Sequence, residues 1–546
     1  MQTISYTRLL DKIHGGWYAK CLGGAAGAPV EGVKALIDVE DFTDIYNPDL
    51  PNDDLDIQLL WLEVLETKGV YLNSCNLADA WNEKCWYPFS EYGYFMKNYR
   101  RGIRPPYTGV INNSFFKEGM GCPIRSEIWG FISAGNPELA VQYAYMDATL
   151  DHAGNSVYAE QFLAAVESMA FFESDIGVLL TQGLSFIPAD CKLADCIRLV
   201  MGQYRAGADW VHTRKAMLRR FGHPDFSNVT QNLGMVAIAL LYGGGDIRKT
   251  INIALKCGYD ADCTCATAAA IVGVIQGYAG LGEEICSLIQ NYFVIGIDVQ
   301  RPTNRIDDLA RDTCNIALLA PNDAVEITQA PKGLASVCKP TGFAGFPLES
   351  VTPEGLEREI KKLKPMVWEA FGPFFMPLEK EDDPRYPSPH GEGCVLPTLE
   401  CMVNNAVSLD TIYADEYTLD FAKADACCTI LAYEDLIPVE TYITMEGQMC
   451  VYLQTEIEVA EAGRVWVVVG NNDGFRLWNN GQLILERDEI RYWTPYNNFT
   501  WMDLKKGKNR LVLKLLRRTE LLKFSIGFRE YDGNHWHRSQ WRVDIP

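Results

Sequence analysis

The spacing of apolar residues changes once along the chain, and this change limits the fold more than any other feature. Up to about residue 320, apolar side chains recur every three or four residues in long segments, and Gly-rich or polar breaks separate them. This spacing predicts helices and few strands. The clearest helical segments are 56–66, 137–146, 158–172, 232–242 and 264–276. We therefore expect residues 1–335 to form an all-α domain.

The chain after this domain has a different pattern. Residues 336–365 are rich in proline and predict a linker with a short helix at 353–364, which has a proline in its first turn. From residue 366 onward, short alternating segments are separated by turns such as Asn480-Gly481, which favours a tight hairpin. The clearest predicted strands are 455–459, 464–469, 474–478, 482–486, 510–515 and 523–528. Such a series predicts an antiparallel β-sandwich of jelly-roll type over residues 366–546.

The charge balance excludes one large class of function. The chain has 49 basic and 71 acidic residues, a net charge of −22 and a pI near 4.8. Proteins that bind a nucleic-acid polymer usually have the opposite sign, because lysine and arginine neutralise the phosphates. We therefore expect no nucleic-acid polymer as a partner. A small anionic ligand with its own metal ion is compatible with this charge.

The sequence favours a cytoplasmic protein with no membrane partner. Residues 1–20 have no apolar core of signal-peptide length and contain several charges. The uncharged stretch 263–282 is about as long as a membrane span, but its Ala, Thr and Gly content favours a helix buried inside protein. The 17 cysteines are odd in number and include no C-x-x-C pair, which is typical of a reduced compartment.

Two acidic clusters stand at the starts of strongly apolar helical segments. The first is Asn52-Asp53-Asp54-Leu55-Asp56, and the second is Asp260-Ala261-Asp262-Cys263. A single aspartate at such a place needs only to cap the helix, because its side chain accepts backbone N–H bonds. Three aspartates in one cluster and two in the other exceed this need. Alternate carboxylates in a tight turn can direct several oxygens at one point, as Mg²⁺ requires, so capping and metal binding are both open from spacing alone.

Several blocks, in the right order, resemble the ADP-ribosylglycohydrolase family. The first block, 11–31, ends in the family's G-x-P-x-E signature, and the acidic clusters fall where the family has Thr-Asp-Asp-Thr and Gly-Gly-Asp-x-Asp-Thr. The segments 124–130, 144–152 and 240–246 are similar to the family's sequence between the clusters. The resemblance implies an orthogonal all-α catalytic fold. It also implies a centre of one or two Mg²⁺ ions at the mouth of that fold, with Mn²⁺ as the alternative ion.

The resemblance also implies a set of metal ligands, with departures from the family pattern. Asn52 and Cys263 stand where the family has threonines, and Tyr259 replaces a glycine. Cysteine is a soft ligand and poorly matched to Mg²⁺. We therefore expect the geometry, or the number of ions, to differ from the family standard, as in a bacterial branch that has Asp-x-Asp-Cys. The predicted metal ligands are Asn52, Asp53, Asp54, Asp56, Asp260, Asp262 and Cys263.

Cleavage of a glycosidic bond passes through an oxocarbenium-like transition state, usually between two carboxylates. We assign the catalytic carboxylates to Glu31 and Asp54. Glu31 follows a Gly/Pro turn at the expected cleft mouth, where a solvated loop glutamate is the competing interpretation. His152 adjoins Asp151, so a structural histidine competes with the family's cleft-lining role. The residues predicted to bind substrate are His152, Asn155, Asp147 and Arg125.

The C-terminal half has a resemblance of its own. Residues 465–481 and 504–514 are similar to accessory β-sandwiches of carbohydrate-active enzymes, in which such a module binds sugar or has a structural role. The sequence leaves these two roles open, since fold alone does not determine function.

These observations together predict a magnesium-dependent hydrolase that acts on a small molecule. The expected reaction is cleavage of an N- or O-glycosidic bond to ADP-ribose or a related ribosyl group. One alternative is a glycoside or nucleoside hydrolase that uses the same metal site on a free sugar conjugate. Another is a non-catalytic ligand-binding protein. The sequence allows a homo-oligomer without specifying one.

Overall fold

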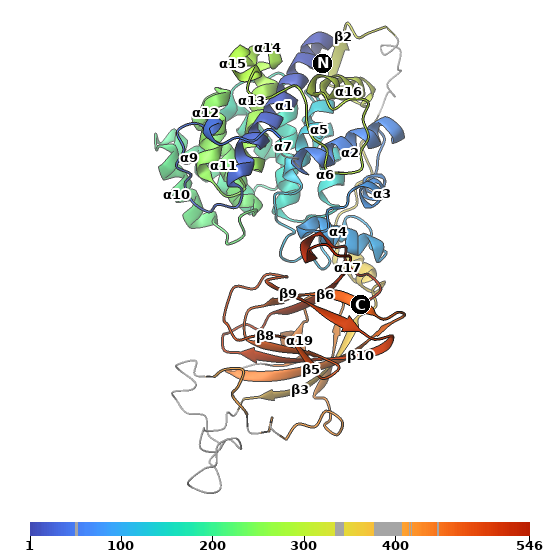
Figure 1. The fold of residues 1–546 in the computed structure, drawn as a ribbon. Helices are drawn as coiled ribbons and strands as arrows, with labels where there is room; N and C mark the ends of the chain where they lie inside the picture. The colour runs from blue at the N-terminus through green and yellow to red at the C-terminus, as the bar shows by residue number, and fades with distance from the viewer. Residues whose placement is uncertain (50–52, 333–342, 376–406, 414, 417, 445–446) are drawn as a thin grey trace. The chain divides into compact units, whose positions relative to one another are not determined.

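The computed structural model describes residues 1–49, 53–332, 343–375, 407–413, 415–416, 418–444 and 447–546. It divides into two compact units, of which the first is largely helical and the second largely β (Figure 1). Unit 1 comprises Met1–Trp86, Ser90–Phe95 and Arg104–Thr352. Unit 2 comprises Tyr87–Phe89, Met96–Ile103 and Pro353–Pro546.

Unit 1 confirms the predicted helical fold. Its helices are α1 (Tyr6–Gly27), α2 (Asp53–Lys68), α3 (Ser74–Lys84), the first part of α4 (Ser90–Arg100), α5 (Ser126–Ile132), α6 (Pro137–Ala148), α7 (Asn155–Met169), α8 (Ile176–Gly183), α9 (Lys192–Arg205), α10 (Trp210–Phe221), α11 (Val229–Gly243), α12 (Ile247–Cys257), α13 (Ala261–Gln276), α14 (Tyr278–Leu281), α15 (Glu283–Cys286) and α16 (Ile306–Leu319). Two short strands, β1 (Gln2–Ser5) and β2 (Val325–Thr328), pair in parallel within it. Four residues are too few to produce a recognisable alternation, so the sequence did not predict this pair.

Helices α1 and α13 touch through their backbones. A Cβ atom at Gly15 would lie 2.4 Å from the carbonyl oxygen of Gly273, and one at Gly27 would lie 2.2 Å from that of Ala261. Side chains at these positions would hold the helices apart, so the glycines set the distance between them. This contact places the end of α1 beside the start of α13, which carries the second acidic cluster (Figure 1).

Unit 2 is a sandwich of two antiparallel sheets, which confirms the predicted β fold. The strand order is β4-β3-β5-β10-β7-β8 in one sheet and β11-β6-β9 in the other. Residues from both sheets, such as Val467 of β6 and Leu513 of β10, are buried in a common hydrophobic core. The strands are β3 (Met366–Phe374), β4 (Cys428–Ala432), β5 (Met449–Val459), β6 (Gly463–Asn471), β7 (Phe475–Asn479), β8 (Gln482–Arg487), β9 (Asn498–Leu504), β10 (Gly507–Arg517) and β11 (Phe524–Glu530), and the short helices are α17 (Pro353–Ile360) and α19 (Val439–Tyr442).

The hairpin between β7 and β8 follows from its turn residues. Asn480 and Gly481 have φ values of 51° and 85°, the left-handed conformation that a type I′ turn requires at both central positions. Strand β9 was not among the clearest predicted strands. Its outward residues include Phe499 and Trp501, which are exposed, so the strand lacks the alternation of apolar and polar residues on which the prediction relied.

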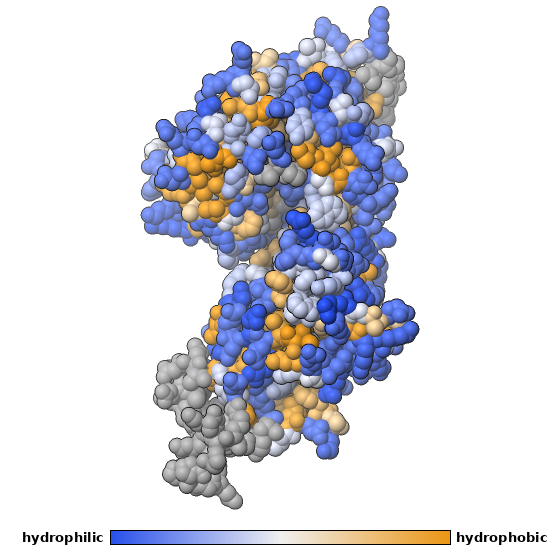
Figure 2. Space-filling view, in the orientation of Figure 1, coloured by the Kyte–Doolittle hydropathy of each residue, from blue (hydrophilic) through white to orange (hydrophobic). Residues whose placement is uncertain are grey.

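The surface seen in Figure 2 is mainly hydrophilic, with separate hydrophobic patches on each unit. Within the described part of the chain, the helices are all too short or too polar to cross a bilayer.

The helix contact predicts a large effect of one added methyl group. Gly27→Ala should lower the free energy of unfolding by about 1–3 kcal/mol or more, because the new Cβ cannot fit beside the Ala261 carbonyl. Denaturant unfolding measures this change. The matched control is Gly202→Ala in α9, where no atom lies within 4 Å of the added Cβ and stability should hold or rise. Equal losses in the two variants would contradict the close-contact explanation.

Candidate metal centre

Three segments bring acidic side chains together in unit 1. Glu31 follows the short 3-10 turn η1 (Ala28–Val30) at the end of α1, and Asp53 and Asp54 open α2. Asp260 occupies the N-cap position of α13 without a capping hydrogen bond from its side chain, and Asp262 and Cys263 lie in the first turn. Two backbone hydrogen bonds of 2.8 Å hold the first segment against the third, from Gly32 N–H to Tyr259 O and from Tyr259 N–H to Val33 O.

Tyr259 occupies a strained position in this connection. Its φ is 65°, a left-handed conformation that costs a non-glycine residue about 1–2 kcal/mol. The sequence resemblance places a glycine here, which would adopt the same backbone without strain. The tyrosine ring packs against Arg214, whose guanidinium lies 5.6 Å from the ring centroid.

The donor atoms form two groups that share one residue. Oxygens of Glu31, Asp260 and Asp262 lie within 4.8 Å of one another, and so do donor atoms of Asp54, Asp262 and Cys263. We call these the oxygen triad and the thiol triad. Asp262 belongs to both triads, so the two groups are adjacent halves of one centre.

The donor set fits a divalent cation. Asp262 is 7% exposed, and its Oδ1 has no hydrogen-bond donor among the described residues. A buried carboxylate oxygen without a donor is costly unless a cation neutralises it. The oxygen triad offers three carboxylates of the kind that Mg²⁺ and Mn²⁺ prefer.

Burial and mutual repulsion together raise the pKa values of these carboxyl groups. The neighbouring Asp262 carboxylate raises the pKa of Glu31 to about 8, with partial desolvation at the pocket wall as the second cause. Burial and then Asp262 raise the pKa of Asp53 to about 7. Burial likewise raises the pKa of Asp54 and of Asp260 well above the ordinary aspartate value. Without a cation, the centre therefore holds protons near neutral pH.

A buried lysine that no sequence pattern indicated supports the first turn of α2. Lys20 is 1% exposed, and its Nζ donates to Glu127 Oε1 and to the carbonyl oxygen of Ile124, both at 2.9 Å. Gln58 Nε2 donates to Glu127 Oε2 at 2.9 Å and to the carbonyl oxygen of Asp54 at 3.0 Å. This network fixes the backbone that presents Asp54.

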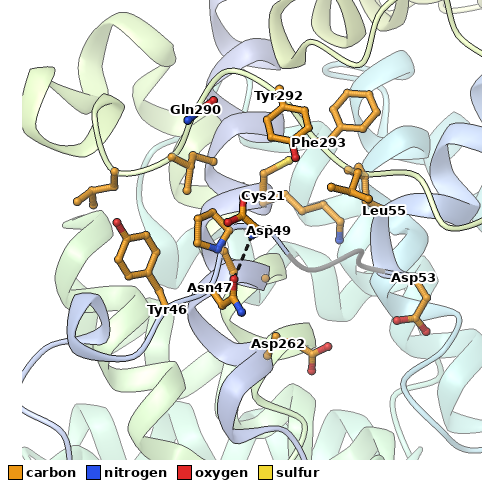
Figure 3. Close-up of a pocket in the computed structure, with 18 of the residues that line it drawn as sticks. Cys21, Tyr46, Asn47, Asp49, Asp53, Leu55, Asp262, Gln290, Tyr292 and Phe293 are labelled. Atoms are coloured by element: carbon orange, nitrogen blue, oxygen red, sulfur yellow. Dashed lines mark hydrogen bonds between the residues drawn. The ribbon is translucent and has the colours of Figure 1, made fainter.

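The centre adjoins a pocket of about 530 Å³. Asp53 and Asp262 lie at one end of it in the view of Figure 3, and Tyr292 and Phe293 lie on the loop across from them. Tyr46 lines another wall. These aromatic residues were not predicted from the sequence, because they lie in irregular loops without periodicity.

Arg125 and Asp147, predicted to bind substrate, lie in the interior. Arg125 is fully buried, and both of its terminal nitrogens donate to Asp151 at 2.9 Å. It also forms an ion pair of 2.8 Å with Asp147, which accepts bonds from the indole nitrogens of Trp61 and Trp129. Neither residue is among the described residues that line the pocket, and their substrate-binding roles stay predictions.

The structure places His152 beside this network and Asn155 at the start of α7, and neither is among the described residues that line the pocket. Burial alone would lower the pKa of His152, but Asp151, 2.8 Å away, outweighs burial and raises it to about 9. Glu91 lies 3.6 Å from the other ring nitrogen. Asn155 Nδ2 donates to Glu118 at 2.9 Å, and its Oδ1 accepts from the first turn of α9. The binding roles of both residues stay predictions.

Three of the predicted metal ligands, Asn52, Asp53 and Asp56, are not members of the two triads. Asp53 lines the pocket beside Asp262. Both carboxylate oxygens of Asp56 accept from the backbone N–H of Gly296, at 3.0 and 3.1 Å. Side chains two residues apart on a helix point in different directions, so Asp56 does not face the same way as Asp54. Asp56 instead links the loop at Gly296 to α2 and is in neither triad. Asn52 lies outside the described residues.

The family model for ADP-ribosylglycohydrolase matches residues 5–322. The chain therefore belongs to the ADP-ribosylglycohydrolase family. The match covers the described helices of unit 1 from α1 to α16, including every residue of the two triads.

Three solved structures of low sequence identity are similar to parts of the chain. An ADP-ribosylglycohydrolase-related protein complex is 17% identical, with 57% of this chain and 99% of that chain covered and a TM-score of 0.42. A PA14 sugar-binding domain from an RTX adhesin is 12% identical, with 33% and 99% covered and a TM-score of 0.20. A β-glucosidase from Kluyveromyces marxianus in complex with glucose is 13% identical, with 19% and 14% covered and a TM-score of 0.17. No curated protein matches the chain.

The raised pKa values predict how pH and Mg²⁺ together change stability. The folded centre keeps protons that the unfolded chain releases near pH 4, so stability without metal should fall as pH rises from about 5 to 8. Bound Mg²⁺ replaces those protons. The rise in melting temperature on adding Mg²⁺ to EDTA-treated protein should therefore be larger at pH 8 than at pH 5.5. At a concentration 100 times the Kd, one ion adds about 2.7 kcal/mol, which is several degrees. An equal rise at both pH values would contradict the competition between protons and metal.

Isosteric variants test whether Asp262 is a metal ligand and whether Asp56 is not. Asp262→Asn should raise the Kd for Mg²⁺ by at least about tenfold, because both triads lose a charged ligand. Asp56→Asn should leave it unchanged, since an amide oxygen can still accept from Gly296. Isothermal titration calorimetry measures both. Loss of binding in Asp56→Asn alone would restore Asp56 as a ligand.

Proposed function

We propose that the chain is a divalent-metal-dependent hydrolase that cleaves an N- or O-glycosidic bond to an ADP-ribosyl or related ribosyl group. The observation that carries this proposal is the pair of triads sharing Asp262 beside a pocket of about 530 Å³. Pockets of this size are typical of small-molecule sites. Membership of the ADP-ribosylglycohydrolase family supports the reaction class.

The residues of the centre divide into holding and proton-transfer roles. Asp54, Asp260 and Asp262 would hold the cation, with Asp53 at the edge of the pocket. A bound divalent cation supplies Lewis-acid stabilisation of charge that develops on substrate oxygens. Glu31 lies on the solvent side of the centre, and its raised pKa lets the carboxyl hold a proton near neutral pH. It can therefore give a proton to the leaving group or take one from the attacking water.

The walls of the pocket suit a flat polar ligand. Tyr46, Tyr292 and Phe293 offer aromatic faces and edges, and Asn47 and Gln290 add amide groups. Aromatic rings exclude water from one side of a ligand, and amides can bond to its hydroxyl or ring nitrogen atoms. A nucleoside or sugar conjugate has both kinds of surface.

The charges around the pocket support a second candidate, a glycoside or nucleoside hydrolase acting on a neutral sugar conjugate. Glu31, Asp49, Asp53 and Asp262 line it, and Lys20 is the single cation among its described lining residues. Lys20 is already bonded to a carboxylate, so little positive charge is left for a pyrophosphate apart from bound metal.

A hydrolysis screen separates these candidates. Purified protein with Mg²⁺ or Mn²⁺ is tested on ADP-ribosyl-arginine, O-acetyl-ADP-ribose, nucleosides and p-nitrophenyl glycosides, with product release followed by chromatography. We expect release of ADP-ribose or ribose that EDTA abolishes and that Asp262→Asn lowers at least about a hundredfold. Asp246→Asn is the control, because Asp246 only caps α12 and asparagine caps as well.

Each outcome of the screen has a distinct meaning. Turnover of nucleosides or plain glycosides alone would favour the second candidate. Equal activity of Asp262→Asn and the parent would contradict the metal-dependent mechanism. Mg²⁺ binding without turnover of any substrate would favour a non-catalytic ligand-binding role.

A further inference from the structure

The two triads differ in the chemistry of their donors. The oxygen triad consists of three carboxylates, and the thiol triad replaces one carboxylate with the sulfur of Cys263. Cys263 is a free thiol and is 7% exposed. Its Sγ donates to Asp54 Oδ1 at 3.5 Å, so the sulfur is directed at the carboxylate that shares its triad. A cation bound here would meet sulfur and oxygen together.

The triads also differ in exposure. Asp54 and Cys263 are 1% and 7% exposed, whereas Glu31 of the oxygen triad is exposed to solvent. Both triads use Asp262, whose Oδ1 has no donor among the described residues and so is available to a cation. The thiol triad is therefore the more enclosed half of the centre.

Ligand chemistry selects different ions for the two halves. Three carboxylates suit the hard ions Mg²⁺ and Mn²⁺. A thiolate with two carboxylates suits a softer ion, and sites with three protein ligands and an open position are typical of zinc enzymes. We propose that the thiol triad Asp54–Asp262–Cys263 is a selective site for a thiophilic divalent cation such as Zn²⁺ or Co²⁺, beside a hard-ion site at Glu31–Asp260–Asp262.

This inference rests on the metal-dependent function proposed above. Binding breaks the S–H bond of Cys263, and the proton passes to solvent. A sulfur lone pair then forms the bond to the cation, and no electron is transferred. The reaction of substrate is not involved, so binding is measurable without turnover.

Two other cysteines near the centre provide matched controls. Cys21 of α1 lines the same pocket, and Cys265 lies two residues beyond Cys263 on α13. Cys265 Sγ is directed at the carbonyl oxygen of Ile251, 3.7 Å away, and is outside both triads. Substitution of either residue should therefore leave the proposed site intact.

The experiment is a Co²⁺ titration of the full-length, reduced, metal-free chain in buffer containing Mg²⁺. A thiolate bound to Co²⁺ absorbs in the near ultraviolet by charge transfer, and this band should saturate at one Co²⁺ per chain. Cys263→Thr and Cys263→Ser should lose the band, while Cys21→Ser and Cys265→Ala retain it. Competition with Zn²⁺ should show a Kd at least about tenfold higher in Cys263→Thr than in the parent. Circular dichroism and unfolding curves establish that each variant is folded.

Specific results would overturn the proposed thiol site, and they differ from those that would overturn the proposed function. Absence of the band from the parent chain, or its persistence in folded Cys263→Thr and Cys263→Ser, would overturn the thiol site. Its loss in Cys21→Ser instead would assign the thiolate to Cys21 and overturn it as well. Failure of the proposed function would appear separately, as absence of metal-dependent hydrolysis in the substrate screen, whatever the absorption shows.

Discussion

The backbone contact between α1 and α13 is the constraint on which the centre depends. Glu31 leaves the end of one helix, and Asp260 and Asp262 open the other. Their oxygens can lie within 4.8 Å only because glycines such as Gly27 let the two backbones touch. A run of small residues that looks featureless in the sequence therefore sets the spacing of the charged atoms.

Two buried networks in unit 1 differ in how the negative charge of their carboxylates is neutralised. Arg125 sits between Asp147 and Asp151, so that network contains its own positive charge. The acidic centre has one buried lysine, Lys20, which is bonded to Glu127 and lies beside a larger number of carboxylates. Its remaining charge is left to protons or to a cation. The repulsion that remains without a cation is offset elsewhere, by the apolar packing of the unit.

Periodicity and turn chemistry predicted much of the fold. The helical segment 264–276 falls within α13, and Asn480-Gly481 forms the left-handed turn expected of it. Strand β9 was not predicted because its exposed face carries aromatic residues, and β1 and β2 were not predicted because they are short. The spacing of residues along the chain indicates only local structure. The three strands were not predicted because they depend on contacts between residues that are distant in sequence.

The candidate site was predictable to a similar degree. The acidic clusters identified the donor residues Asp54, Asp260 and Asp262, which the structure brings together. Spacing alone could not show that Asp56, two residues after Asp54, turns toward Gly296. The aromatic wall at Tyr292 and Phe293 comes from an irregular loop, and its position depends on the tertiary fold.

The sharing of Asp262 couples the two halves of the centre. A cation in one half draws on the charge of a carboxylate that the other half also uses, and two cations so close repel each other. If both halves bind cations as proposed, occupancy of either half weakens binding to the other by one and the same free energy, whichever ion binds first. The proposed centre would then act as an anticooperative pair, and the ion with the higher ratio of concentration to Kd would determine how much of the other ion is bound.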